Sequence, residues 1–154
     1  MLIRKAMKSE MDSIYLMGYD VWGDDLNDIE TYLNGCRNSK KYALGEWYVL
    51  IVDGLVVSSL IMYHDQFKLT GSDLGIGSIS TSPNFRKNGY AKDLVNLMVS
   101  QMFATTETEI IFLHSDIGYQ FYEQLGFNRT SSVSECMYKK KSIDVELSGI
   151  PTYF

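Results

Sequence analysis

The chain of 154 residues is 45% hydrophobic and 21% charged, values close to the average of one ordinary globular domain. Its 14 basic and 19 acidic side chains give a formal charge of −5, which disfavours a nucleic-acid partner and favours cationic ones. The two cysteines, Cys36 and Cys136, and the two histidines, His64 and His114, lack the spacing of a metal site, so we expect no metal.

The amino terminus carries charges where a signal peptide needs an apolar segment, and no apolar run reaches the ~20 residues that span a bilayer. We therefore expect a cytoplasmic protein without membrane contact, either a monomer or a homodimer. Only Pro83 and Pro151 interrupt the chain, and no repeat or linker is evident. A single domain over residues 1–154 is the prediction.

The first forty residues predict one strand and two helices. Leu2 and Ile3 begin a short strand, and Ser9 with Asp12 resembles a helix-capping pair before a helical apolar pattern over residues 11–22. Residues 24–38 predict a second, polar helix with acidic residues near its start, where they favour a helix amino end. Those acidic residues are Asp24, Asp25, Asp28 and Glu30.

The remainder predicts strands, with two further helices between them. Residues 47–52 and 55–63 are apolar runs joined by Asp53 and Gly54, a strong hairpin signal. The other expected elements are a strand over 74–81, a long helix after Pro83, a strand over 110–113, a helix over 118–125 ended by Gly126, a strand begun by Phe127 and a last strand over 133–140. This order predicts an α/β (α+β) fold: a mixed, mostly antiparallel central sheet flanked by about four helices.

The segment SISTSPNFRKNGYA, residues 78–91, combines a strand end with a turn and a helix start. Small residues at Gly89 and Ala91 leave the backbone uncovered there, and amides at a helix amino end bind phosphate through hydrogen bonds and the helix dipole. The alternative for such an isolated motif is that the small residues only permit tight packing of strand against helix.

A second segment, FLHSDIGYQFYEQLGF at residues 112–127, favours the phosphate-binding interpretation of the first segment over the packing interpretation. Together the two segments resemble the GNAT superfamily of acetyl-CoA-dependent N-acetyltransferases, whose pattern is a strand, R/Q-x-x-G-x-G/A, a helix, a strand and a helix ending in F-Y-x-x-x-G-F. The resemblance extends over nearly the whole chain and implies a GNAT-like fold. More loosely, both segments resemble a branch that includes fungal lysine N-acetyltransferases.

The resemblance implies acetyl-CoA as co-substrate and assigns candidate residues by position. The pyrophosphate cradle would comprise Arg86, Lys87, Asn88, Gly89, Tyr90, Ala91 and Lys92. The strand edge that holds the pantetheine arm would comprise Ile79, Ser80 and Thr81, with the Thr81 amide polarising the thioester carbonyl. Tyr122 would be the general acid and a further coenzyme contact. Ser115 stands where many members have Asn, so it is either a coenzyme contact or only a helix cap.

The implied acceptor is a primary amine of a small molecule or peptide, and the acidic residues near 24–30 favour a cationic one. Such an amine must lose a proton before attack, since with a pKa of about 10.4 only roughly one in a thousand is neutral near physiological pH. The general base stays open among the following residues: Asp28, Glu30, His64, Asp65 and Asp73. A non-catalytic sensor that binds acetyl-CoA or CoA is the alternative to an enzyme.

Overall fold

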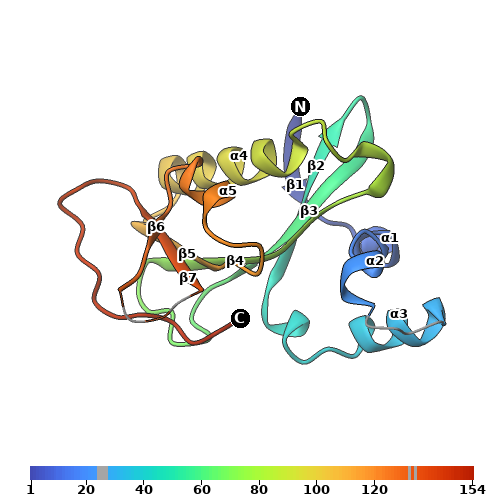
Figure 1. The fold of residues 1–154 in the computed structure, drawn as a ribbon, viewed down its shortest axis with the longest axis horizontal. Coiled ribbons are helices and arrows are strands. Elements are labelled where there is room, and N and C mark those ends of the chain that lie inside the picture. The colour runs from blue at the N-terminus through green and yellow to red at the C-terminus, as the bar shows by residue number, and fades with distance from the viewer. Residues whose placement is uncertain (24–27, 132, 134) are drawn as a thin grey trace. The chain divides into compact units, whose positions relative to one another are not determined.

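The computed structural model describes residues 1–23, 28–131, 133 and 135–154, and Figure 1 shows the elements that they form. The strands are β1 (Leu2–Lys5), β2 (Glu46–Val52), β3 (Leu55–Tyr63), β4 (Asp73–Thr81), β5 (Ile110–His114), β6 (Asn128–Arg129) and β7 (Cys136–Lys140). The α-helices are α1 (Met11–Leu16), α2 (Tyr19–Trp22), α3 (Ile29–Arg37), α4 (Tyr90–Thr105) and α5 (Gln120–Glu123). Three short 3-10 turns complete the list: η1 (Lys8–Glu10), η2 (Tyr42–Leu44) and η3 (Pro83–Phe85).

The strands form one sheet in the order β1-β2-β3-β4-β5-β7-β6. The pairs β1–β2, β5–β7 and β6–β7 are antiparallel, whereas β4 and β5 are parallel over Asp73–Gly75 and Ile110–Phe112. The predicted mixed, mostly antiparallel sheet with helices is therefore confirmed. The described residues contain five α-helices where about four were expected, because the first predicted helix is divided in two.

The chain forms two compact units. Unit 1 comprises residues 1–61 and 78–95, and unit 2 comprises residues 62–77 and 96–154. The core of unit 1 contains Val49, Leu50 and Leu60, all without exposed surface. The prediction of a single domain stays a prediction.

The hairpin in unit 1 forms as the sequence predicts. Asp53 and Gly54 connect β2 to β3 with φ angles of +50° and +78°. Positive φ at both central residues is the geometry of a type I′ turn, whose twist matches that of the flanking strands. Glycine carries no Cβ penalty in this region, which explains the Asp-Gly pair.

The single helix expected over residues 11–22 is wrong in one respect, because it breaks between α1 and α2. A Cβ atom on Gly18 would lie 2.0 Å from the Trp22 ring, so the glycine makes room for this side chain. The capping role of Ser9 and Asp12 is also wrong. Glu10 instead accepts a hydrogen bond from the Met7 N–H at 2.8 Å and pairs with Arg4.

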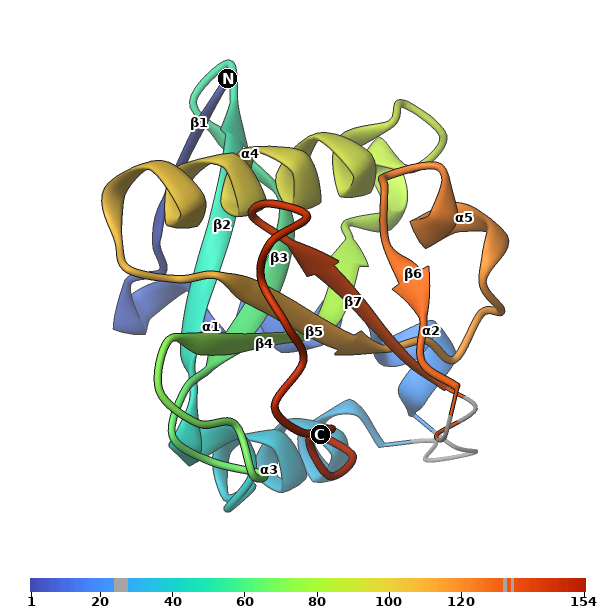
Figure 2. The ribbon, with the colours of Figure 1, turned by 90° about the vertical axis from the view of Figure 1, so that its left-hand side faces the viewer.

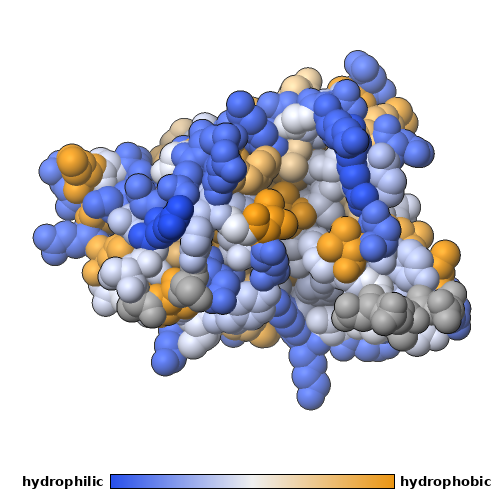
Figure 3. Space-filling model, in the orientation of Figure 1, coloured by the Kyte–Doolittle hydropathy of each residue, from blue (hydrophilic) through white to orange (hydrophobic). Residues whose placement is uncertain are grey.

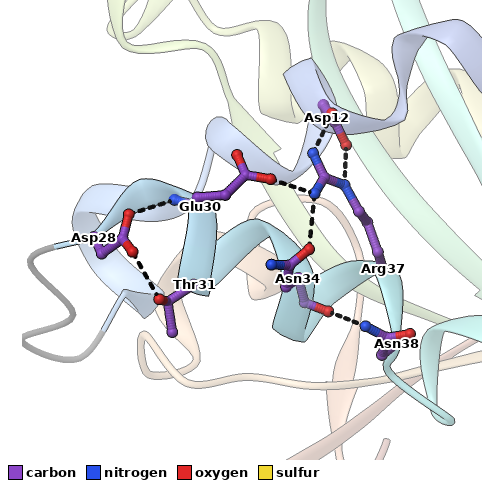
Figure 4. A network of polar contacts seen from close by, with 7 residues as sticks. All are labelled: Asp12, Asp28, Glu30, Thr31, Asn34, Arg37 and Asn38. Carbon is purple, nitrogen blue, oxygen red and sulfur yellow. Dashed lines mark hydrogen bonds and ion pairs between the residues drawn. The ribbon is translucent and has the colours of Figure 1, made fainter.

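Helix α3 begins at Ile29, later than predicted, and Figure 4 shows the polar network along it. Asp28 is its N-cap, accepting hydrogen bonds from the Glu30 N–H at 3.0 Å and the Thr31 hydroxyl at 2.9 Å. Arg37 pairs with Glu30 at 2.7 Å and with Asp12 at 2.6 Å. Asp28 and Glu30 thus stabilise the helix and its neighbour α1, while Asp24 and Asp25 lie outside the described residues.

In unit 2, β5 supplies the core residues Ile111, Phe112 and Leu113, none more than 1% exposed. The strand predicted to begin at Phe127 begins at Asn128, because the Phe127 N–H still donates to the Tyr122 carbonyl at the end of α5. The last strand begins at Cys136 rather than at 133, and the Val133 carbonyl instead accepts hydrogen bonds from Thr130 Oγ1 and the Cys136 N–H.

The last residues of unit 2 follow β7 and end in an aromatic cluster; Figure 2 draws them in dark red. The Phe154 ring is 5% exposed and lies 4.6 Å from the His114 ring and 5.5 Å from the Tyr63 ring, between centroids. Gly75 makes room for it, since a Cβ atom there would lie 2.5 Å from the Phe154 ring.

The exposed apolar side chains are scattered. Val21, Ile117 and Ile143 are 65%, 69% and 89% exposed, and the face in Figure 3 shows separate small hydrophobic patches among hydrophilic residues. Single exposed apolar residues are normal on protein surfaces and mark no site by themselves. No helix in the described part of the chain is long and apolar enough to cross a membrane.

Candidate functional site

The turn between β4 and α4, in unit 1, has an open backbone. Lys87 and Gly89 have φ angles of +65° and +81°. A Cβ atom on Gly89 would meet nothing within 4 Å, so the glycine serves backbone conformation and surface access rather than close packing. The alternative in which Gly89 only permits tight strand-helix packing is therefore not supported at this residue.

Arg86 holds this turn in place. Its guanidinium donates to both carboxylate oxygens of Asp20, at 2.5 and 2.8 Å, and to the Met17 carbonyl at 2.9 Å. Its Nε donates to the Thr81 carbonyl at 3.1 Å. The Arg86 guanidinium lowers the pKa of Asp20, so the pair is fully charged near neutral pH. Arg86 thus links Asp20 of α2 and the Met17 carbonyl to the start of the turn at Thr81.

Asn88 lies near the end of the turn, two residues before α4 begins at Tyr90. The Asn88 side-chain amide donates to the Phe85 and Arg86 carbonyls at 3.0 and 3.2 Å. Helix α4 has sixteen residues, and the backbone N–H groups of its first turn have no partner within the helix. These N–H groups belong to Tyr90, Ala91 and Lys92, so the structure brings the predicted cradle together on one turn.

The strand edge before the turn is contacted by hydroxyl groups from β3. Ser58 Oγ donates to the Ser80 carbonyl at 2.6 Å and lies 3.0 Å from Thr81 Oγ1. Ser59 Oγ lies 3.3 Å from Ser80 Oγ. Ser78 has a φ of +46°, which bends β4 immediately before the predicted segment Ile79–Thr81. Ser58 and Ser59 are fully buried, and the Ser58 hydroxyl holds the backbone of this bent strand edge from inside.

In unit 2, Ser115 shapes a second turn. Its hydroxyl contacts the Gly118 carbonyl and accepts a hydrogen bond from the Ile117 N–H at 3.4 Å, while its own N–H donates to the Glu135 carbonyl at 2.8 Å. The N-cap of α5 is Tyr119 without a side-chain hydrogen bond, so Ser115 is not the cap of α5. The coenzyme contact of Ser115 stays a prediction.

Tyr122 lies on α5 and is 7% exposed, with its ring edge-on to Phe121 at 5.0 Å between centroids. Burial, together with the charge of Asp116, raises the pKa of Tyr122 to about 12. Asp116 also accepts a hydrogen bond from the Tyr153 hydroxyl at 3.2 Å. Tyr122, like an ordinary tyrosine, is protonated near neutral pH, which is the state that a general acid requires.

The candidate bases divide into two groups. Asp28 and Glu30 are engaged on α3, as described above, which favours their structural role. His64 Nδ1 lies 2.9 Å from the Asp65 carboxylate in an exposed pair, and burial together with the nearby Glu109 raises the pKa of Asp73. His64, Asp65 and Asp73 thus stay as candidates. No group of three or more metal-ligating side chains occurs among the residues described.

Sequence reasoning missed Asp20 and Ser58, which brace the β4–α4 turn and the strand edge before it, and it missed Tyr153, which donates a hydrogen bond to Asp116 in unit 2. Two adjacent serines inside the apolar strand 55–63 were a usable signal, because buried hydroxyls need partners. Asp20 is 66 positions from Arg86, and no spacing rule relates them.

The family model described as "Acetyltransferase (GNAT) domain" matches residues 2–130, most of the chain. The chain belongs to the GNAT acetyltransferase family. GNAT enzymes use acetyl-CoA as co-substrate, and the protein is accordingly an acetyl-CoA-dependent acyltransferase. No curated protein sequence matches the chain.

Solved GNAT structures share the fold at low identity. A GNAT acetyltransferase from Brucella melitensis in complex with acetyl-CoA is 16% identical, with a TM-score of 0.68 over 99% of this chain and 95% of that one. A GNAT N-acetyltransferase from Escherichia coli in complex with CoA is 14% identical, with a TM-score of 0.70 over 99% and 87%. A chimeric spermidine N-acetyltransferase from Vibrio cholerae is 13% identical, with a TM-score of 0.67 over 92% and 97%.

The residues of the β4–α4 turn fit the diphosphate of a GNAT coenzyme. Gly89 offers open space at its α-carbon, the first turn of α4 offers N–H groups, and Lys87 and Lys92 add positive charge beside them. The finer resemblance to the fungal lysine branch stays a prediction.

Proposed function

We propose that the protein transfers an acetyl group from acetyl-CoA to a primary amine of a small molecule or peptide. The observation that carries this proposal is the β4–α4 turn, in which Arg86 and Asn88 hold the backbone open at Gly89. When bound, acetyl-CoA supplies the thioester carbonyl that the amine nitrogen attacks. Residues 86–92 would hold its diphosphate, and residues 79–81 its pantetheine arm.

The proposed chemistry assigns one task to each group. The Thr81 N–H donates to the thioester oxygen while negative charge develops there. The C–N bond forms, the C–S bond breaks, and the Tyr122 hydroxyl gives its proton to the departing thiolate. The proton of the amine passes to a base, for which His64 with Asp65, or Asp73, are the candidates, directly or through water.

A non-catalytic sensor of acetyl-CoA or CoA is the second candidate. Tyr122 favours the enzyme, since it stands at the position of the general acid in the GNAT pattern that the sequence resembles. A thiol-release assay with acetyl-CoA and a panel of primary amines separates the two. An enzyme releases CoA in proportion to added amine, whereas a sensor binds acetyl-CoA and gives no amine-dependent release.

Coenzyme binding is tested separately by thermal unfolding with CoA. A ligand at a hundred times its Kd stabilises the folded state by about 2.7 kcal/mol, so the midpoint of unfolding should rise. A folded protein whose midpoint is unmoved by millimolar CoA would exclude the coenzyme site itself.

Among primary amines, the proposed acceptor is a cationic one. The formal charge of −5 supports a cationic amine. The described acidic residues Asp28 and Glu30 add little, because each is used within the α3 network. An amine panel should therefore include diamines, lysine peptides and neutral amines of equal size.

Two buried free cysteines, Cys36 and Cys136, support a cytoplasmic setting for the protein, where thiols stay reduced.

A further inference from the structure

The Ser80–Thr81 peptide group is fixed by a side chain from the neighbouring strand. Ser58 Oγ donates to the Ser80 carbonyl oxygen at 2.6 Å, and Ser58 is fully buried. In a trans peptide the C=O of one residue and the N–H of the next share a plane and point in opposite directions. A bond that holds the Ser80 carbonyl therefore also sets the direction of the Thr81 N–H.

Backbone pairing gives the same direction independently. The Ser82 N–H donates to the Val57 carbonyl of β3 at 2.9 Å, so Ser82 faces β3. Successive residues of a strand alternate the side to which their backbone groups point. The Thr81 N–H thus points away from β3, while the Ser80 carbonyl points toward it and toward the Ser58 hydroxyl.

The bend in β4 explains why a side chain is needed here. Ser78 adopts a φ of +46°, which interrupts regular strand geometry three residues before Thr81. Arg86 Nε holds the Thr81 carbonyl at 3.1 Å and so fixes the following peptide group. The preceding peptide group, which carries the Thr81 N–H, is held by Ser58.

We propose that Ser58 is a positioning residue that aims the Thr81 N–H at the thioester oxygen through its hydrogen bond to the Ser80 carbonyl. This inference rests on the proposed function, in which the Thr81 N–H stabilises the charge that develops on that oxygen. Removing a donor of this kind costs roughly 10²–10³-fold in turnover, and misdirecting it costs less.

The test compares Ser58→Ala and Ser58→Cys with Ser59→Ala. The first variant deletes the hydroxyl, and the second keeps the volume but offers only a weak S–H donor. Ser59 is an equally buried neighbour whose hydroxyl contacts the Ser80 side chain and Met17 rather than a carbonyl, so it is the matched control. We expect kcat to fall roughly tenfold to a hundredfold in both Ser58 variants, with the midpoint shift caused by CoA unchanged.

A spectroscopic measurement reports the hydrogen bond directly. Infrared difference spectra of acetyl-CoA, isotope-labelled at the carbonyl carbon and bound without acceptor, should show a lowered carbonyl stretching frequency in the parent and in Ser59→Ala. In the Ser58 variants, the frequency should return toward that of free acetyl-CoA. A packing defect alone would not move this band.

The outcomes separate the two proposals. A parent protein whose bound carbonyl band equals that of free acetyl-CoA would overturn the role of the Thr81 N–H, and with it the inference. A shifted band that persists in folded Ser58→Ala or Ser58→Cys, with parental kcat, would overturn the role of Ser58 alone and leave the proposed function standing.

Discussion

The turns before α4 and α5 start from similar local geometry and differ in what they offer. Gly89 and Gly118 have φ angles of +81° and +84°, and a Cβ atom on either would meet nothing within 4 Å. The first glycine precedes a helix of sixteen residues with a full turn of N–H groups. The second precedes a helix of only four residues. A glycine with positive φ therefore precedes a helix start suited to anion binding in the first turn and not in the second.

Side chains reinforce this difference. Arg86 and Asn88 hold the first turn by contacts with backbone carbonyls and with Asp20, leaving the helix start uncovered. Ser115 folds its hydroxyl into the second turn, and Asp116 adds negative charge there. One turn is the proposed coenzyme site, while the other leads to the residue proposed as the acid, Tyr122.

The largest expected effect separates chemistry from binding at the second turn. Tyr122→Phe removes only the hydroxyl, so kcat should fall roughly 10²–10⁴-fold while stability and CoA affinity change little. Steady-state kinetics with an identified acceptor, alongside calorimetry with CoA, provide the measurement. Near-parental kcat would make Tyr122 a packing residue, and weaker CoA binding at unchanged kcat would make it a binding contact.

The next effect tests the two glycines against each other. Gly89→Glu places bulk and negative charge where the diphosphate should approach, so CoA affinity should fall roughly a hundredfold or more. Gly118→Glu is the matched variant, with the same strain at positive φ, and should keep its CoA affinity. Calorimetric titration of both folded variants with CoA measures the two affinities. Equal affinities would show that the two turns do not differ in anion binding.

A smaller effect tests how Arg86 contributes to the first turn. We expect the planar Arg86 guanidinium to anchor the backbone, because an ammonium group cannot reproduce its contacts with Asp20, Met17 and Thr81. Arg86→Lys should therefore weaken CoA binding nearly as much as Arg86→Ala, by roughly tenfold. Titration calorimetry of both variants provides the measurement. Full affinity in Arg86→Lys would instead mean that positive charge alone is required.

The smallest effect is a pH dependence of the same anchor. The Arg86 guanidinium lowers the pKa of Asp20, so the unfolded chain binds a proton at higher pH than the folded one. The Asp20–Arg86 pair stabilises the folded state fully at pH values above the ordinary carboxyl pKa. This stabilisation is lost as the pH falls through the lowered pKa of Asp20. Asp20 is 51% exposed, so the loss should be below about 1 kcal/mol.

Urea unfolding of the parent and of Asp20→Asn between about pH 5 and about pH 3 measures this loss. The variant should show a flatter decline of the unfolding free energy toward acid pH. Parallel curves would mean that the Asp20–Arg86 pair adds nothing to the stability of unit 1, and the turn would then depend on its hydrogen bonds to carbonyls alone.

Local patterns in the sequence were sufficient to predict most of the strands and helices and the family. Asp53-Gly54 predicted the hairpin, and the order of apolar runs predicted the mixed sheet, because both depend on backbone conformation and on side-chain periodicity along a few neighbouring residues. The two motifs at residues 78–91 and 112–127 predicted the GNAT family for the same reason, since each is a continuous strand-turn-helix segment.

The tertiary structure decided which side chains brace those segments. The break at Gly18 depends on the packing of Trp22, and the roles of Asp20 and Ser58 depend on contacts with residues 66 and 22 positions away. Contacts of this kind arise only when distant elements pack together, and no spacing along the chain encodes them. The sequence therefore determined where a coenzyme turn could form, whereas folding in three dimensions decided what holds the turn open and in which direction the Thr81 N–H points.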